Sequence, residues 1–383
     1  MKFRAVVAGA AVWLAALAVG SAATPALAAD VSRSRSPARK PPAASRTIRV
    51  TLSEDSGQGS LRAAIEEANA AAVASYPEES EQLRARRAVT IQMAIPAGHV
   101  LVQERALPDI EGPGTVLDGG GATIRQAQDC RRADGRKGCD GIVVAGPGIT
   151  VRALRIVGFM FDGVSVRGAA ARDVRIEDVH AIDNLDDGIG VSSAAGPVVI
   201  ERCLLMGNGY RTKGKGVLVF DDSRAVIRDS VAVANRDGIS ITRRAQAELE
   251  RVWIVGSFDK GLGVSGGVLR GKDNRIIANG DGFGFSEKPP NGDGLRVGLG
   301  GSAELSSTRI EGNGDAGVVV LDTSSVVLHG GSVSAGHGGR ALVCGRDASL
   351  RTEDVTVLSG RDSDGGVTKA RRRKPLTAPA DSR

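Results

Sequence analysis

The stretch Asp187-Gly188-Ile189-Gly190-Val191 decides the fold, because its pattern of Asp-Gly followed by an apolar, a variable and an apolar residue returns along most of the chain. Close copies are Asp162-Gly163-Val164-Ser165-Val166 and Asp237-Gly238-Ile239-Ser240-Ile241, and Lys replaces Asp in Lys215-Gly216-Val217-Leu218-Val219. Most repeat glycines stand 22 to 28 residues apart, and one step spans 33. Such a period indicates a solenoid, in which each repeat buries its apolar face only against its neighbours.

Each repeat contains two or three short apolar runs separated by Gly, Asn and Asp, which is typical of short strands joined by turns. Helical periodicity is missing from residues 141–360, and the 52 glycines and 3% aromatic residues suit stacked, tightly turned coils. A β-sandwich would not explain one phrase at a fixed period. The sequence therefore predicts an all-β chain that forms a single-stranded parallel β-helix, a solenoid with coils of about 22–25 residues.

The N-terminus has the features of a secretory signal. Lys2 and Arg4 precede an apolar run from Ala5 to Val19, and Ala26-Leu27-Ala28 is a small-residue cleavage site. We therefore predict a signal peptide over residues 1–28 and a secreted or periplasmic protein. No second apolar stretch of about 18 residues follows, so no membrane span is expected in the mature protein.

The net charge of +6 is unevenly distributed. Residues 1–28 carry +2, residues 29–46 carry +4 and residues 361–383 carry +4, which leaves −4 for residues 47–360. The two basic segments are rich in Ser, Pro and Arg and are expected to be a disordered linker and a disordered tail. Since the body lacks a basic stripe, we expect no nucleic-acid partner.

One segment departs from the strand pattern. Residues 47–76 predict a strand and then a short capping helix, with Ser60 as its N-cap residue and an apolar face formed by Leu61, Ala64, Ile65 and Ala68. A solenoid needs such a cover, because the open end of its first coil is an unpaired edge.

The same segment carries a family resemblance. Asp55-Ser56-Gly57-Gln58-Gly59-Ser60-Leu61-Arg62-Ala63-Ala64-Ile65, with Asn69 after it, resembles the "DSGxGSLRxAI…AN" segment of secreted bacterial right-handed parallel β-helix proteins. Leu107-Pro108-Asp109-Ile110 and residues 116–124 resemble the first coil of those proteins. The resemblance implies a right-handed, pectate-lyase-like β-helix over residues 47–360. That family includes lyases, hydrolases, epimerases and proteins without known activity, so the fold does not assign a reaction.

The four cysteines predict one local crosslink. Cys130 and Cys139 flank a basic insert and are expected to form a disulfide in an oxidising compartment. Cys203 and Cys344 lie in distant repeats and are expected to be buried as small apolar residues. No cysteine or histidine spacing indicates a zinc site.

The position before the repeat glycine forms a column along the coils, because in-register strands stack about 4.8 Å apart. Its residues are Asp140, Asp162, Asp187, Lys215, Asp237 and Lys260. The alternating signs from Asp187 onward favour a structural charge ladder. The alternative is that this column lies along a substrate groove.

The groove hypothesis centres on Asp187, where the repeat carries extra acidic residues and a lengthened basic turn. Asp187 and Asp237, two coils apart, would lie about 10 Å apart, close to the roughly 6.5–9.5 Å of an inverting glycosidase pair. The predicted catalytic residues are Asp187, Asp237, Lys215 and Asp186. The predicted substrate-binding residues are His180, Tyr210, Arg211, Lys213 and Arg236.

Two further features remain open at this stage. Asp183, Asp186 and Asp187 are a candidate calcium site for a lyase or an epimerase. Phe283 and Phe285 are expected to plug the coil interior, or else to form a sugar platform. Asp186-Asp187 resembles the paired-Asp motif of polygalacturonases, but the rest of that signature, the arginine signatures of pectate lyases and the Asp-Pro-His motif of alginate epimerases are absent.

Two functions follow from these observations. The first is an exported, monomeric β-helix protein that binds an acidic polysaccharide or envelope glycan along an external groove and processes it as a lyase, hydrolase or epimerase. The second is a non-catalytic envelope or surface protein with a structural or adhesive role.

Overall fold

The computed structural model describes residues 46–73, 89–95, 99–210, 212–280 and 292–358. The chain divides into residues 1–43 and residues 44–383, and every described residue belongs to the second unit. The predicted signal peptide, the tail, Arg211, Phe283, Phe285 and all of the basic linker except Arg46 lie outside the described residues. No helix among the described residues is long and apolar enough to cross a membrane.

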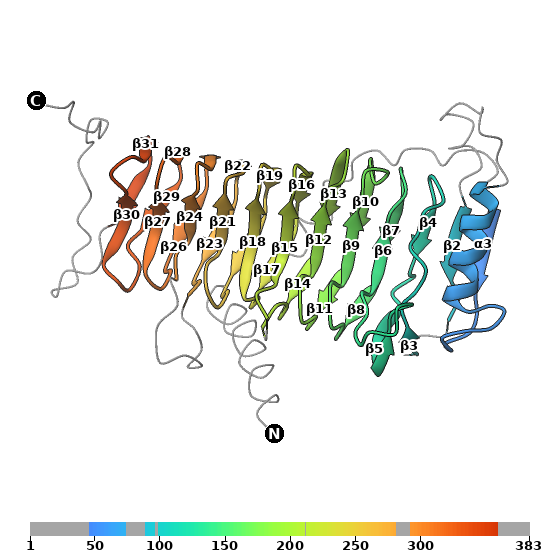
Figure 1. Cartoon of the computed structure of the whole chain (residues 1–383). Helices are drawn as coiled ribbons and strands as arrows, with labels where there is room; N and C mark the ends of the chain where they lie inside the picture. The colour runs from blue at the N-terminus through green and yellow to red at the C-terminus, as the bar shows by residue number, and fades with distance from the viewer. Residues whose placement is uncertain (1–45, 74–88, 96–98, 211, 281–291, 359–383) are drawn as a thin grey trace, which may run out of the picture. The chain divides into compact units, whose positions relative to one another are not determined.

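Three parallel sheets run the length of the second unit (Figure 1). Sheet A has twelve strands: β1 (Arg46–Val50), β2 (Val89–Met93), β4 (Val116–Asp118), β7 (Thr150–Arg152), β10 (Val174–Glu177), β13 (Pro197–Glu201), β16 (Arg224–Arg228), β19 (Gln246–Glu250), β22 (Val268–Lys272), β25 (Ser302–Ser306), β28 (Ser325–His329) and β31 (Ser349–Glu353). Sheet B has eleven: β3 (Val100–Arg105), β5 (Thr123–Arg131), β8 (Arg155–Val157), β11 (His180–Ile182), β14 (Leu204–Met206), β17 (Val231–Val233), β20 (Trp253–Val255), β23 (Arg275–Ile277), β26 (Arg309–Glu311), β29 (Ser332–Ser334) and β32 (Thr356–Leu358). Sheet C has nine: β6 (Ile142–Val144), β9 (Val164–Arg167), β12 (Ile189–Ser192), β15 (Lys215–Phe220), β18 (Asp237–Thr242), β21 (Leu262–Ser265), β24 (Leu295–Gly298), β27 (Ala316–Val320) and β30 (Arg340–Cys344).

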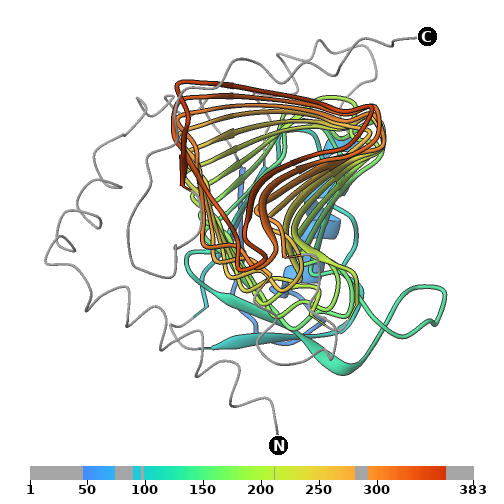
Figure 2. The ribbon, with the colours of Figure 1, turned by 90° about the vertical axis from the view of Figure 1, so that its left-hand side faces the viewer.

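A coil contributes one strand to each sheet, so the three sheets form the sides of the cross-section in Figure 2. Strands pair in register, and the repeat therefore places equivalent residues on top of one another. In sheet C, Val164, Ile189 and Val217 follow one another in register, and each is fully buried. Stacked apolar residues fill the interior, which is the main source of stability in such a fold. The predicted parallel solenoid is confirmed.

The repeat glycine is explained by a ladder of buried asparagines at the turn between sheets B and C. The Nδ2 group of Asn184 donates to Oδ1 of Asn208 (2.9 Å), and Asn208 donates in the same way to Asn235 (2.9 Å). A Cβ atom on Gly188 would lie 2.8 Å from Nδ2 of Asn208 and 2.6 Å from the carbonyl oxygen of Gly216. Glycine is needed because a side chain would collide with the ladder and with the next coil.

The ladder is interrupted once among the described coils. Asn279 and Asn313 continue it (2.9–3.0 Å bonds), but Ser257 occupies the position after Asn235. The backbone N–H of Ser257 donates to Asn279, whereas its buried hydroxyl has no hydrogen-bond partner in the described part of the chain. Serine is too short to bridge to the next amide, so the bonding between coils is weaker here.

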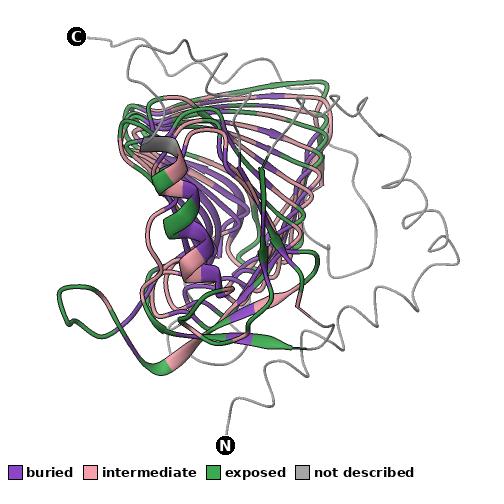
Figure 3. Ribbon diagram, turned by 90° about the vertical axis from the view of Figure 1, so that its right-hand side faces the viewer, coloured by how far each residue is buried: buried purple, intermediate pink, exposed green. Residues whose placement is uncertain are grey.

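Helix α3 (Leu61–Val73) covers the first coil. Figure 3 shows its buried face turned toward the strands. Leu61, Ala64, Ile65 and Ala68 are all at most 3% exposed, and the hydroxyl of Ser60 accepts the N–H of Ala63 (3.2 Å). The predicted cap, its N-cap residue and its apolar face are therefore confirmed.

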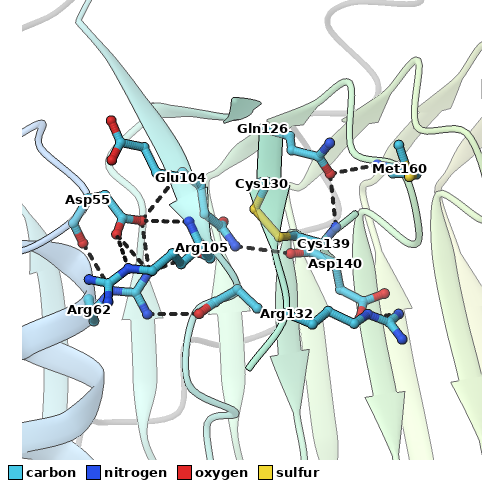
Figure 4. Close-up of a disulfide and its surroundings, with 12 residues drawn as sticks. Asp55, Arg62, Glu104, Arg105, Gln126, Cys130, Arg132, Cys139, Asp140 and Met160 are labelled. Atoms are coloured by element: carbon cyan, nitrogen blue, oxygen red, sulfur yellow. Dashed lines mark hydrogen bonds and ion pairs between the residues drawn. A yellow bond between two sulfur atoms is a disulfide. The ribbon is translucent and has the colours of Figure 1, made fainter. Parts of the chain in front are cut away.

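The segment that resembles other secreted β-helix proteins links α3 to the neighbouring strands (Figure 4), and we call its Asp55–Arg62 ion pair the clasp. The guanidinium of Arg62 donates to both carboxylate oxygens of Asp55 (2.8 and 2.9 Å) and to the carbonyl of Ala106 (2.8 Å). Asn69 donates to the carbonyl of Asp109 (2.7 Å) and accepts the N–H of Glu111 (2.9 Å). These side chains join the capping segment to the first complete coils, so the motif has a structural role.

A disulfide joins Cys130 and Cys139 and closes the basic insert into a loop, as Figure 4 shows. Gln126 fixes the base of this loop, because its Oε1 accepts the N–H groups of Cys139 (3.1 Å) and Met160 (2.9 Å). Cys203 is buried as expected, whereas Cys344 is exposed. The prediction for Cys344 is wrong because it lies in the last coil of sheet C, where no further described strand covers it.

Candidate active site on sheet C

Three aspartates form a stack at the start of consecutive sheet C strands. The N–H of Asp162 donates to Oδ1 of Asp140 (3.2 Å), and the N–H of Asp187 donates to Oδ1 of Asp162 (3.2 Å). The N–H of Lys215 in turn donates to Oδ1 of Asp187 (2.7 Å). Each carboxylate thus bonds to the backbone of the next coil, and like charges are held at the coil spacing.

Small residues on the outward face of sheet C make room for this stack. A Cβ atom on Gly190 would lie 2.4 Å from Oδ2 of Asp162. The carboxylate of Asp162 therefore lies over strand β12 of the following coil. Gly190 therefore makes room for the carboxylate of Asp162, whereas the repeat glycine Gly188 makes room for the asparagine ladder.

Burial and mutual repulsion raise the pKa values of these carboxyl groups. Burial, and then the neighbouring Asp186, raise the pKa of Asp187 from 3.8 to about 7, against the opposing effect of Lys215. Burial and the charge of Asp187 raise the pKa of Asp162 well above its ordinary value. Burial also raises the pKa of Asp140, while Arg132 and Arg167 oppose that rise. A carboxyl group whose pKa lies near neutrality can exchange a proton at physiological pH.

The disulfide loop supplies the charge at the N-terminal end of the stack. The guanidinium of Arg132 lies 3.7 Å from the carboxylate of Asp140 and 3.9 Å from the ring centroid of Phe161. Figure 4 shows Arg132 reaching from the loop toward Asp140. Of the three stacked aspartates, Asp140 therefore has an arginine partner, whereas Asp162 and Asp187 have none among the described residues.

Beyond Lys215 the column changes character. Nζ of Lys260 lies 2.7 Å from Oδ2 of Asp237, and both side chains are largely buried. The expected charge ladder is confirmed for this pair. Oδ1 of Asp237 is buried and has no hydrogen-bond partner among the described residues. The Lys215 ammonium group donates to the carbonyl of Lys213, so only its backbone N–H contacts Asp187.

An aromatic pair is formed by residues that precede the column positions Lys215 and Lys260 in the chain. Tyr210 and Phe258 pack edge to face with 6.2 Å between ring centroids, and the guanidinium of Arg236 lies 5.9 Å from the Phe258 ring. The backbone N–H of Arg236 donates to the carbonyl of Asn208 (2.9 Å), which fixes its turn to the asparagine ladder. Arg236 directly precedes Asp237, so a cation and a ring edge adjoin the column.

Other predicted site residues lie elsewhere. His180 begins strand β11 of sheet B, in register with Arg155 and Leu204, and burial lowers its pKa. It is therefore on another sheet from Asp187. Lys213 is exposed in the turn before β15. The sequence grouped His180 with the Asp187 site because the three-residue strands of sheet B are too short to show an alternating pattern.

The predicted calcium site does not assemble. Among the described residues, no three His, Cys, Asp or Glu side chains are arranged to hold a metal ion. Asp183 is exposed, and its carboxylate lies against Gly207, where a Cβ atom would be 2.3 Å from Oδ1. Burial alone raises the pKa of Asp183, with no contribution from Asp186 or Asp187. Asp183 thus belongs to a different part of the turn.

Comparisons with known proteins agree on the architecture. Residues 136–279 match the family model described as the right handed beta helix region. The fold is a right-handed parallel β-helix. No curated protein shows significant similarity to the chain.

Among solved structures, the β-helix resembles a variant of the periplasmic alginate epimerase AlgG at 13% identity and a TM-score of 0.50, covering 71% of this chain and 77% of that one. It also resembles a pectate lyase at 13% identity and 0.42 (83% and 79% covered). A third is an Azotobacter vinelandii mannuronan C-5 epimerase module, at 14% identity and 0.46 (82% and 100% covered). At these identities the likeness concerns the fold.

Proposed function

We propose that this protein is an exported β-helix enzyme that binds an acidic polysaccharide along the sheet C column and hydrolyses its glycosidic bonds. The observation that carries the proposal is the contrast between two carboxyl groups on one column. Burial raises the pKa of Asp187 to about 7, whereas Asp237 is ion-paired with Lys260. Carboxyl groups whose environments separate their protonation states mark an acid and a base.

In the proposed reaction, Asp187 gives its proton to the glycosidic oxygen as the bond to the anomeric carbon breaks. The unpartnered Oδ1 of Asp237 accepts a proton from the water molecule whose oxygen attacks that carbon. Lys260 holds Oδ2 of Asp237 and orients the base. Arg236 is placed to pair with a uronate carboxylate, and the Tyr210–Phe258 pair offers an apolar edge to a sugar ring.

The test measures new reducing ends from polygalacturonate and from alginate. Asp187→Asn and Asp237→Asn should each lower the rate by about a hundredfold or more. Asp140→Asn changes the same repeat position two coils earlier and should leave the rate unchanged. Wild-type activity should decline above pH 7, as Asp187 loses its proton. Unsaturated products, detected by ultraviolet absorbance, would show that the enzyme cleaves the polymer by elimination and not by hydrolysis.

A non-catalytic envelope or surface protein is the second candidate. The Lys260–Asp237 pair and the pair formed by Arg296 with the fully buried Asp293 favour it, because both stabilise the column without a substrate. Polymer binding without any product, in the wild type and in Asp187→Asn alike, would support this function.

A further inference from the structure

The outward face of sheet B differs from the site on sheet C. Two columns of stacked side chains run along this face. The first extends from β8 to β26 and the second from β8 to β23, and together we call them the sheet B strip. In register, the first column contains Arg155, His180, Leu204, Val231, Trp253, Arg275 and Arg309. The second contains Val157, Ile182, Met206, Val233, Val255 and Ile277. The six strand steps of the longer column span about 29 Å.

The strip is apolar and partly open to solvent. Leu204, Met206, Val231, Val233 and Trp253 are all half-buried on consecutive strands. A contiguous apolar surface with polar ends is typical of a binding surface. Such a surface also follows the solenoid axis, because each coil adds two side chains to it.

Arginines stand at both ends of the strip without carboxylate partners. Arg155 and Arg309 are exposed and form no ion pair within the described ranges. Arg275 lies over Trp253, with its guanidinium carbon 4.4 Å from the ring centroid. Arg125, which pairs in register with Val157, likewise has no described carboxylate partner.

Sheet A shows that these unpaired arginines are not a general property of the surface. On its outward face, Arg152 bonds to Asp118 (2.8 Å), Arg224 to Glu248 (2.7 Å) and His329 to Glu353 (2.9 Å). Most cations there have an acidic neighbour on the same or the adjacent strand. On sheet B the next residue of the second column is Glu311, which accepts the hydroxyl of Ser332 and forms no ion pair with Arg309 or Arg275 within the described ranges. The positive charge of the strip is therefore available to an outside anion.

The charge of the strip indicates which kind of molecule binds to it. A second copy would place unpaired arginines against one another. The chain's own termini are basic, with +4 in residues 29–46 and +4 in residues 361–383. A nucleic acid would favour a row of stacking aromatic rings, whereas Trp253 is the only aromatic residue of the strip. A uronate polymer offers both carboxylates for guanidinium groups and apolar sugar faces for Trp253 and its aliphatic neighbours.

We infer that the sheet B strip binds an acidic polysaccharide as a second surface, separate from the Asp187 site. The class of polymer rests on the proposed function, but the strip needs no catalysis. A chain held there would raise the local concentration of polymer beside sheet C. The carboxylates would contact the arginines at the ends, and the sugar rings would lie over the apolar centre.

The experiment uses the full chain with Trp13→Phe, which leaves Trp253 as its single tryptophan. Titration with polygalacturonate or alginate should change the emission of Trp253 saturably, whereas neutral dextran should not. Arg155→Glu combined with Arg275→Glu should weaken binding about tenfold or more. Arg49→Glu combined with Arg351→Glu changes the net charge equally on exposed sheet A positions and should leave the affinity within about twofold.

Several results would overturn the inference: an unchanged emission, an equal loss in the sheet A control, or equally tight binding of single-stranded DNA. Thermal unfolding of each variant shows whether the strip variant is folded. Asp187→Asn should abolish product formation and leave the Trp253 titration intact. Absent products with an intact titration therefore contradict only the proposed function, whereas normal products with a silent titration contradict only the strip.

Discussion

The two halves of the sheet C column have the same backbone arrangement but differ in how their charged side chains interact. From Asp140 to Asp187 the column stacks three carboxyl groups, each bonded to the backbone of the next coil. From Asp237 onward, side-chain ion pairs take over, beginning with Lys260. The asparagine ladder changes at the same place, since it is continuous from Asn184 to Asn235 and interrupted at Ser257.

This difference shows that a repeat fixes where side chains lie but not what they do. Identical positions become acids of raised pKa where an aspartate follows an aspartate. Where the sign alternates, Lys260 forms an ion pair with Asp237, whereas the Lys215 ammonium group donates to a carbonyl. The first half stores electrostatic repulsion that a reaction can use, and the second half removes it. The predictions below test whether the two halves differ in this way.

The largest expected effect is a pH dependence of stability that Asp187 causes. The folded pKa of Asp187 lies at about 7, above its ordinary 3.8, so the folded state binds more protons than the unfolded state between these values. Its stabilising contribution is therefore full below about pH 4 and is lost as the pH rises through 7. The shift corresponds to about 4 kcal/mol.

The check is urea unfolding at pH 4.5 and pH 8 for the wild type and Asp187→Asn. Asparagine should reduce the decline in stability between these pH values, and Asp162, whose pKa is also raised, should cause part of the remainder. Asp222→Asn is the matched control. Its hydrogen bond to Arg244 lowers the pKa of Asp222, so this variant should not reduce the decline. An unchanged pH dependence in Asp187→Asn would contradict the stacked-acid description.

Asn208→Ala should destabilise the protein by about 3 kcal/mol. The substitution leaves the Asn184 amide without its acceptor, removes the donor to Asn235 and opens a cavity in a fully buried turn. Ser257→Ala, at the interrupted position of the other half, should cost less than about 1 kcal/mol, because its hydroxyl has no partner. Chemical denaturation of both variants measures the difference, and equal losses would show that the ladder does not distinguish the halves.

Lys260→Met should destabilise the protein by about 2 kcal/mol near neutral pH, because Asp237 would then be buried without its counter-ion. Lys215→Met is the control in the first half, where the ammonium contacts a carbonyl and not Asp187. A larger loss in Lys215→Met would reverse the assignment of the two halves.

Ser257→Asn should have the smallest effect, and it should stabilise the protein where the other substitutions destabilise it. Asparagine at this position should complete the ladder between Asn235 and Asn279 and raise stability by about 1 kcal/mol. Gly238 leaves the space, as the equivalent Gly188 does for the amide of Asn208. A lower melting temperature in this variant would show that the turn cannot admit the longer side chain.

The sequence predicted the features that depend on the repeat alone. The coil, the capping face of α3 and the column position of Asp187 and Asp237 follow from periodicity, and periodicity dictates register. Part of the asparagine ladder also has a signal in the sequence, since Asn184, Asn235 and Asn313 stand two or three residues before their repeat phrases. The lengthened turns after Asn208 and Asn279 break this spacing.

Side-chain directions in the irregular turns could not be predicted. The Lys215 ammonium turns to the Lys213 carbonyl because the lengthened turn brings that oxygen close, and Asp183 faces Gly207 because its backbone has a positive φ of 54°. His180 could not be assigned to sheet B, since a strand of three residues has no alternation to detect. The site is therefore defined by the exceptions to the repeat, which carry no periodic signal.

The Asp55–Arg62 clasp gives the solenoid a direction of assembly. Each coil can align only on a coil that already exists, so the first coil sets the register for all that follow. A chain that is synthesised from its N-terminus exposes the clasp before any repeat, and the clasp can then serve as a template. Growth proceeds from that end toward the C-terminus, and we expect Asp55→Ala to slow refolding more than it accelerates unfolding.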